Sequence, residues 1–223
     1  MVTAPTLHRP LRRSALHHCV VAAGARMKVF QGWERSHSIG DPGVEANALN
    51  TGVALADLSA QHLLLVQAHD LSAWLPFVPE VGQVALTANG GSPTRCCRLT
   101  AESALFLSTD PAQLPPAPSG CVHRTDLTSG RTVVAVAGPL SRDLLRAATQ
   151  VDLRERAMPD RRCVESSLAR VPAMILRFDR RGTLAYEILV PRDFGEYVWE
   201  ALLDAGAPLG VRVVGAAALE PRD

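Results

Sequence analysis

The chain has 223 residues, of which 47% are hydrophobic and 20% are charged, and its formal net charge at pH 7 is +1. This size and composition are those of a globular protein with one large or two small domains and a substantial core. The balanced charge argues against nucleic acid or an anionic membrane surface as a partner. No apolar run approaches the roughly 20 residues that a membrane-spanning helix needs.

Residues 1–12 predict a flexible leader, because they contain Pro5 and Pro10 and no apolar periodicity. No continuous apolar segment precedes a cleavage site, so a secretory signal is not expected. We expect one folded domain over residues 13–223, made of two interleaved subdomains. A linker is predicted near residues 110–120, a stretch that contains four prolines.

The cysteines and histidines give no metal-binding pattern. The cysteines are odd in number and no pair shows the CxxC spacing of structural metal sites. We interpret them as reduced thiols in a cytoplasmic protein, some of them filling the core. His17 and His18 lack a partner at helical ligand spacing and are interpreted as structural residues, so no metal site is predicted. The five cysteines are Cys19, Cys96, Cys97, Cys121 and Cys163.

The first predicted helix covers residues 41–55. Asp41 is placed to cap its N-terminus, Pro42 suits the first helical position, and Gly52 is expected to end it. The face predicted to point inward carries Val44, Ala48 and Leu49.

Short strands dominate the next stretch. They are predicted over residues 62–66, 81–90, 95–99 and 104–108, with a short helix over residues 70–75. The second of these strands enters a Gly-Gly turn. Together they predict an antiparallel meander.

Beyond the linker, residues 132–137 form the strongest β-type run of the sequence. The Gly138-Pro139 turn and a helix over residues 142–149 follow, and Ser141 is predicted to cap that helix. Further strands are predicted over residues 164–171, 173–176 and 185–190. A charged turn, which ends at a glycine, joins the last two strands at residues 179–182.

The last long helix is predicted to follow Pro191. Asp193 is placed as its N-cap with Glu196 as the capping partner, and Gly206 is expected to end it. Its predicted inward face carries Phe194, Val198, Ala201 and Leu202. The mixture of hairpins and helices predicts the α+β class, with antiparallel sheets and packed helices.

Common catalytic signatures are absent from the sequence. There is no GxGxxG, P-loop, GxSxG or HExxH motif. Among the polar residues, the adjacent Tyr186 and Glu187 are the most informative, because one of two neighbouring strand residues must face the core side of a sheet. Five carboxylates are candidate acids or bases, and spacing selects none of them: Glu45, Asp57, Asp126, Glu165 and Glu187.

Several motifs in collinear order resemble the glycine-cleavage T-protein (aminomethyltransferase) family. The stretch that ends in ALADLS at residues 54–59 resembles the strand that carries V-G-L-x-D-x-S in that family. Residues 131–145, RTVVAVAGPLSRDLL, resemble its strand, Gln-Gly-Pro turn and helix. Residues 185–191, AYEILVP, resemble its Gly-Tyr-Glu-x-x-x-Pro strand. The likeness is patchy and extends from about Arg13 to the end of the chain.

This resemblance implies a tetrahydrofolate-binding fold whose full members transfer a one-carbon unit from a protein-bound aminomethyl group. The expected folate-binding residues are Glu187 and the neighbouring Tyr186. The glutamate that matches Glu187 binds the amino-pyrimidine edge of the pterin in the family, and a carboxylate suits that edge because it offers two acceptors to adjacent N–H donors. The alternative interpretation of Glu187 is an ordinary surface carboxylate on a strand.

The departures from the family pattern argue against catalysis. The family's catalytic Asp lies in a Gly-Gly-Ile-x-Asp-Asp segment, whereas residues 90–95 read GGSPTR and contain no carboxylate. Arg180 opens the segment where the family has an aromatic pterin wall, residues 60–61 are Ala-Gln in place of His-Met, and Ala217 replaces an arginine. We also expect the family's C-terminal barrel domain to be absent. No catalytic residue is therefore predicted.

Two hypotheses of different class follow from the sequence. The first is a T-protein-like tetrahydrofolate-binding protein of one-carbon metabolism, in which the lost acid argues against aminomethyl transfer. The second is a non-catalytic subunit that binds a protein partner, similar to the gamma subunit of sarcosine oxidase. The resemblance to that subunit includes the region around Cys163. A retained scaffold that lacks its catalytic group is compatible with either, because a fold alone does not determine activity.

Overall fold

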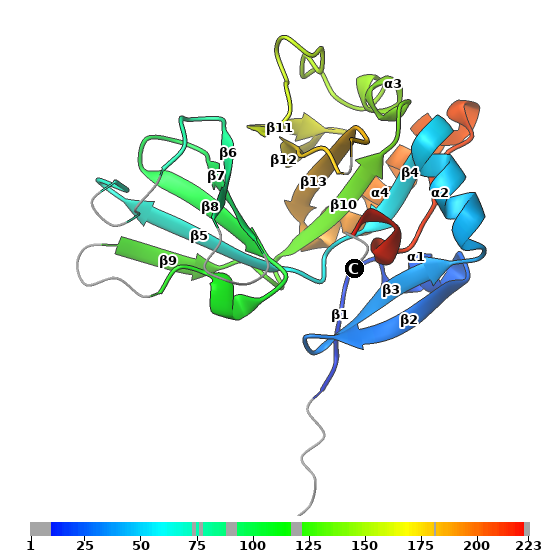
Figure 1. The fold of residues 1–223 in the computed structure, drawn as a ribbon, viewed down its shortest axis with the longest axis horizontal. Helices are drawn as coiled ribbons and strands as arrows, with labels where there is room; N and C mark the ends of the chain where they lie inside the picture. The colour runs from blue at the N-terminus through cyan, green and yellow to red at the C-terminus, as the bar shows by residue number, and fades with distance from the viewer. Residues whose placement is uncertain are drawn as a thin grey trace, which may run out of the picture.

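The structure, a computed structural model, describes residues 10–72, 75, 78–87, 93–116, 122–180 and 182–220. It contains a three-stranded sheet in the order β1-β3-β2, a six-stranded sheet in the order β11-β12-β13-β10-β4-β14, and a five-stranded sheet in the order β6-β7-β8-β5-β9 (Figure 1). Most strand pairs are antiparallel, and the helices are few and short. These features confirm the predicted α+β class.

The bounds of the elements follow the chain. The strands are β1 (Arg12–Arg13), β2 (Ala25–Phe30), β3 (Trp33–Ile39), β4 (Ala54–Asp57), β5 (His62–Ala68), β6 (Val84–Thr87), β7 (Thr94–Arg98), β8 (Ser103–Ser108), β9 (Val122–Asp126), β10 (Arg131–Ala137), β11 (Arg162–Leu168), β12 (Val171–Arg177), β13 (Ala185–Pro191) and β14 (Arg212–Val213). The α-helices are α1 (His17–Ala22), α2 (Pro42–Thr51), α3 (Ser141–Arg146) and α4 (Gly195–Gly206). The 3-10 helices are η1 (Pro111–Gln113), η2 (Arg192–Phe194), η3 (Ala207–Leu209) and η4 (Ala216–Leu219).

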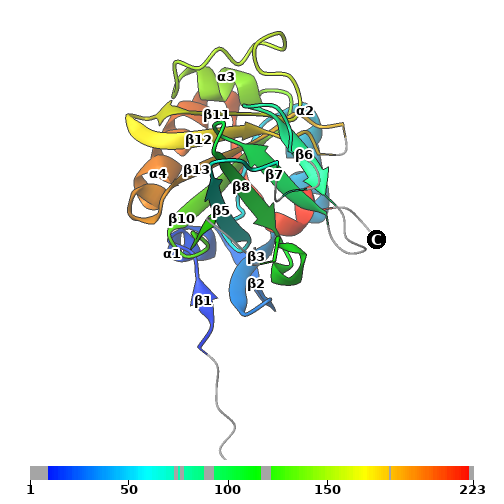
Figure 2. The same ribbon diagram turned by 90° about the vertical axis from the view of Figure 1, so that its left-hand side faces the viewer.

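The five-stranded sheet packs beside the six-stranded sheet, as both ribbon views show (Figures 1 and 2). A shared apolar cluster joins them, and it includes Leu63 and Leu107 from the first sheet and Leu176 and Leu189 from the second. The opposite face of the six-stranded sheet packs against α1, α3 and α4. Strand β13 pairs with β10 on one side and β12 on the other, so its side chains point into one of these two cores.

The first predicted helix is confirmed at its start and corrected at its end. The Asp41 carboxylate accepts hydrogen bonds from the backbone N–H groups of Gly43 and Val44 at 2.7 and 3.3 Å, as an N-cap should. The helix ends at Thr51 with Gly52 as its C-cap, which confirms Gly52 as the residue that ends it. The predicted extent to residue 55 is wrong, because residues 54–57 pair with β10 and form β4. The predicted inward face of this helix was partly wrong, because Val44 is 57% exposed whereas Ala48 and Leu49 are buried.

The helix after β10 also differs from the prediction. Helix α3 begins at Ser141 itself, and the Ser141 hydroxyl donates back to the Gly138 carbonyl at 2.7 Å rather than capping a backbone N–H. The predicted strand over residues 164–171 is divided between β11 and β12. Ala169 and Arg170 form the turn between them, both with positive φ.

The start of the last helix was predicted one residue too early, because the N-cap is Phe194 and not Asp193. Residues 192–194 form the 3-10 helix η2, and the side chain of Asp193 makes no capping hydrogen bond. The inward face therefore begins later, and Phe194 is 46% exposed whereas Val198 and Leu202 are fully buried. Gly195 lies where a Cβ would contact the side chain of Thr132, which explains why a glycine starts the helix against β10.

Several predicted features lie wholly or partly outside the described residues. These are residues 1–9 of the leader, the Gly90-Gly91 turn, part of the short helix over residues 70–75, and residues 117–121 of the linker. Arg12, the last residue of the predicted leader, and Arg13 pair with Trp33 and Glu34 of β3. Within the described residues, every helix is too short or too polar to cross a bilayer.

Candidate functional site: a buried carboxylate between two sheets

Glu187 lies in the middle of β13, opposite Ala135 of β10 and Leu176 of β12. The residue is only 1% exposed. The interpretation of Glu187 as a surface carboxylate is therefore wrong. A carboxylate this deeply buried must be neutralised or hydrogen-bonded, because burying an unpaired charge costs several kcal/mol or more.

Two arginines neutralise this carboxylate. Arg95 of β7 donates from Nη1 to Glu187 Oε1 at 2.5 Å, and Arg180 donates from Nη2 to the same oxygen. The other terminal nitrogen of Arg95 donates to Gln61 Oε1 at 2.7 Å. The Arg95 guanidinium also lies over the ring of Phe178, 5.4 Å from its centroid. The cluster thus joins the five-stranded sheet to the six-stranded sheet with one negative and two positive charges.

Some polar atoms of the cluster have no hydrogen-bond partner among the described residues. They are Glu187 Oε2, Gln61 Nε2 and Arg180 Nε. An acceptor and two donors are therefore buried beside one another without being satisfied. Such groups are uncommon in folded proteins.

The electrostatics of Glu187 follow from two opposing effects. Burial alone would raise the pKa of the carboxyl group, but the charges of Arg95 and Arg180 and their hydrogen bonds outweigh burial and lower the pKa to about 2. Glu187 is therefore ionised throughout the neutral range.

Tyr186, the other predicted site residue, points away from Glu187. It is fully buried in the core on the opposite face of the six-stranded sheet, with the apolar side chains of α3 and α4. Burial raises the pKa of its hydroxyl, and the neighbouring Arg142 partly offsets that effect. The structure does not bring Tyr186 and Glu187 together.

Three of the other candidate carboxylates have roles within the fold. Glu45 is buried and accepts from the backbone N–H groups of Ile39 and Gly215, both at 2.7 Å. Asp57 accepts from the Ser14 hydroxyl at 2.5 Å and from the Ser59 N–H at 3.0 Å, and Asp126 accepts from the Thr128 N–H at 2.9 Å. Glu165 is exposed on β11.

Sequence reasoning missed the partners of Glu187. Arg95 and Arg180 were recognised only as replacements for family site residues. The available signal was that both replacements are cationic and that the one retained site residue is anionic. This pattern favours an internal ion pair once the three positions are known to be close in space.

The comparisons with known proteins agree with the fold. Residues 103–222, which are more than half of the chain, match the family model described as the GCVT N-terminal domain. The aminomethyltransferase of Shouchella clausii is 25% identical over 92% of this chain and 61% of its own length. The gamma subunit of sarcosine oxidase from an Arthrobacter species is 28% identical over 72% of this chain and 76% of its own length. The chain thus spans about three fifths of the aminomethyltransferases it matches.

Two solved structures share the fold. The glycine cleavage system aminomethyltransferase T of Bartonella henselae superposes with a TM-score of 0.76 and 21% identity, over 93% of this chain and 60% of that one. A chain of the heterotetrameric sarcosine oxidase of Corynebacterium sp. U-96 superposes with a TM-score of 0.65 and 22% identity, over 95% of this chain and 99% of that one. The resemblance to aminomethyltransferases and to sarcosine oxidase gamma is therefore confirmed. The chain belongs to the GCVT N-terminal domain family.

Proposed function

We propose that the chain is a non-catalytic, T-protein-like subunit of an enzyme assembly in one-carbon metabolism, comparable to the gamma subunit of sarcosine oxidase. The observation that carries this proposal is the pairing of Glu187 with Arg95 and Arg180. In this proposal, residues 13–223 form one domain that is composed of two interleaved subdomains. The partner is a larger protein subunit, and the chain's similarity over nearly the full length of one chain of a heterotetrameric oxidase supports that role.

The residues around Glu187 do not fit a pterin in their present arrangement. A carboxylate holds the amino-pyrimidine edge through two acceptor atoms that face the ligand. Here Glu187 is 1% exposed and its Oε1 already accepts from two guanidinium groups. For one of the two carboxylate oxygens, the donors that a pterin would supply are therefore provided by the protein itself.

The neighbouring cavity does not give access to the carboxylate either. A cavity of about 780 Å³ lies beside Arg180, between the β2–β3 hairpin, α2 and η4, and Glu187 is not among its lining residues. In addition, Thr94 and Arg95 offer no carboxylate where the family carries its catalytic acid. Both observations support a scaffold role over aminomethyl transfer.

Tetrahydrofolate binding is the second candidate function. The observation that favours it is the set of unsatisfied atoms at the site, because Glu187 Oε2 and Gln61 Nε2 could accept from and donate to a polar heterocycle. Binding would then require Arg95 to leave the carboxylate, so the affinity of the wild-type chain would be low.

The two candidates are separated by calorimetric titration with 5-formyltetrahydrofolate. The proposal predicts no binding to the wild-type chain at millimolar ligand. Arg95→Gln, which removes one of the two guanidinium groups bound to Glu187, is expected to bind the ligand measurably better than the wild type. Arg98→Gln is the matched control, because Arg98 lies on the same strand and its side chain donates, among the described residues, to the nearby Thr100 and Ala101 carbonyls.

The opposite result would establish the second candidate. Binding of 5-formyltetrahydrofolate to the wild-type chain, weakened by Glu187→Gln and unaffected by Arg98→Gln, would show a working folate site. The ion pair would then be a feature of the ligand-free state.

A further inference from the structure

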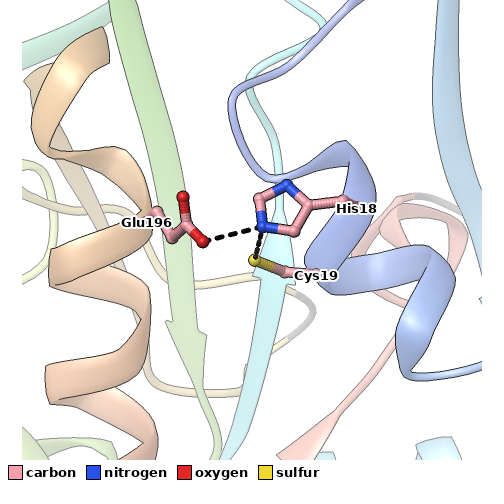
Figure 3. Close-up of side chains that lie close together, drawn as sticks. All are labelled: His18, Cys19 and Glu196. Carbon is pink, nitrogen blue, oxygen red and sulfur yellow. Dashed lines mark hydrogen bonds and ion pairs between the residues drawn. The ribbon is translucent and has the colours of Figure 1, made fainter.

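Helix α1 and the first turn of α4 bring three different metal-ligating side chains together at the surface (Figure 3). His18 and Cys19 come from α1, and Glu196 comes from α4. His18 Nε2 lies 2.8 Å from Glu196 Oε1 and 3.4 Å from Cys19 Sγ. All three ligand atoms lie within 4.8 Å of one another. The imidazole nitrogen therefore faces both the thiol and the carboxylate.

The separations are close to those of a tetrahedral zinc site. Zinc binds imidazole nitrogen and carboxylate oxygen at about 2.0–2.1 Å and thiolate sulfur at about 2.3 Å. In a tetrahedron these bond lengths place nitrogen and oxygen about 3.3 Å apart, and nitrogen and sulfur about 3.5 Å apart. The observed 2.8 and 3.4 Å differ from these values by amounts that small side-chain rotations remove.

The surroundings of Cys19 are suited to a cation. The carboxylates of Glu196 and Glu200 both lie near its thiol. Their negative charges attract a divalent cation, and metal binding displaces the thiol proton.

The simplest alternative is an ordinary surface ion pair between His18 and Glu196. Their side chains are 61% and 54% exposed, and such pairs contribute little to stability. A second exposed pair in this chain, His69 and Glu102, serves for comparison, and its imidazole nitrogen and carboxylate oxygen are 3.3 Å apart. The cluster of His18 differs from that pair by its half-buried thiol at ligand distance.

We propose that His18, Cys19 and Glu196 form a Zn²⁺ site, with its fourth position open to water or to a ligand from a partner protein. The mixed nitrogen, sulfur and oxygen donors favour zinc over magnesium or calcium, which prefer oxygen alone. The site would link α1 to α4, two helices that are far apart in the sequence. This separation is the reason that ligand spacing in the sequence gave no sign of it.

The test is a titration of the EDTA-treated full chain with ZnCl₂ by calorimetry, followed by Co²⁺ absorption spectroscopy. We expect one Zn²⁺ per chain and a thiolate-to-cobalt charge-transfer band in the near ultraviolet. Cys19→Ser should abolish the band. Cys19→Ser, His18→Gln and Glu196→Gln should each weaken Zn²⁺ binding by about 10- to 100-fold or more. That range is the loss seen when residues that only support the ligands of a metal site are removed. The double variant His69→Gln/Glu102→Gln is the matched control and should bind as the wild type does.

Thermal unfolding distinguishes a variant that has lost metal binding from a variant that does not fold. All three ligands are at least partly exposed, so each variant should unfold cooperatively without metal, and Zn²⁺ should raise the melting temperature only where the ligands are intact. The proposal is overturned if the wild-type chain fails to bind Zn²⁺ at millimolar concentration. It is also overturned if Cys19→Ser binds Zn²⁺ as the wild type does, or if binding is lost in the His69/Glu102 control instead.

Discussion

At the scale of single residues, the informative feature is a site carboxylate that has changed its partners. We propose that Glu187 corresponds to the carboxylate that the sequence resemblance assigns to pterin binding, and in this chain two guanidinium groups bind it. By the same resemblance, Arg95 and Arg180 replace other site residues. Removing Glu187 from this cluster would leave two guanidinium groups uncompensated, whereas removing one arginine would leave Glu187 paired with the other.

The first prediction concerns the pH dependence of stability. The folded pKa of Glu187 is lowered from 4.5 to about 2, so its ion pairs stabilise the fold above pH 4.5, and this contribution is lost as the pH falls toward 2. We expect the free energy of unfolding of the wild type to fall more steeply over this range than that of Glu187→Gln. Urea denaturation at a series of pH values measures both slopes, and parallel profiles would contradict the assigned pairing.

The sequence was sufficient to select Glu187 but not to find its environment. The Tyr-Glu motif on a strand marked the residue, whereas the contact with Arg95 joins positions 92 residues apart on different sheets. Tyr186 was selected with it because the two are adjacent in the motif. The alternation of side chains along a strand places them on opposite faces, and the sequence alone did not say which face mattered.

At the scale of elements, the connection between β10 and α3 depends on a close approach between two backbone segments, those of Gly138 and Gly52. Gly138 follows β10 with φ of +115°, and a Cβ at this position would overlap the carbonyl oxygen of Gly52, at the end of α2. The chain can turn toward α3 here because no side chain is present. The Gly-Pro dipeptide at residues 138–139 predicted a turn correctly, but the neighbour from α2 could not be read from it.

The second prediction is that Gly138→Ala destabilises the fold by at least about 1–3 kcal/mol, because the new side chain adds backbone strain to the overlap. Urea denaturation of the purified variant measures the change. Gly130→Ala is the matched control, since its added Cβ would make an ordinary contact at 3.6 Å with the Leu127 carbonyl. Equal stability of the two variants would contradict the importance of this close approach.

Element boundaries depended on partners that local patterns do not reveal. The helix predicted to reach residue 55 ends at Thr51 because residues 54–57 pair with β10. The turn between β11 and β12 places Ala169 and Arg170 at positive φ, a conformation for which neither residue type is a signal. In contrast, the Asp41 cap and the strong β-run of β10 were predicted because their causes are local.

At the scale of the whole molecule, two sheets share an apolar core, and the Arg95–Glu187 pair lies between them. The apolar cluster supplies the non-directional part of the packing between the sheets, whereas the ion pair fixes β7 relative to β13. The class and family could be anticipated from collinear motifs. The order of the strands and the arrangement of the sheets could not, because most of the pairings join distant parts of the chain.

The most direct test of the account is a double-mutant cycle between Arg95 and Glu187, measured by urea denaturation of the wild type, Arg95→Gln, Glu187→Gln and the double variant. Each single variant loses the attraction between Arg95 and Glu187, and in Arg95→Gln the carboxylate keeps Arg180 as a partner. The double variant loses the same attraction only once. We therefore predict that the double variant loses clearly less stability than the sum of the two single losses. Losses that add within about 0.5 kcal/mol would show that the two residues do not interact, and would contradict the proposal that Arg95 occupies the site's carboxylate.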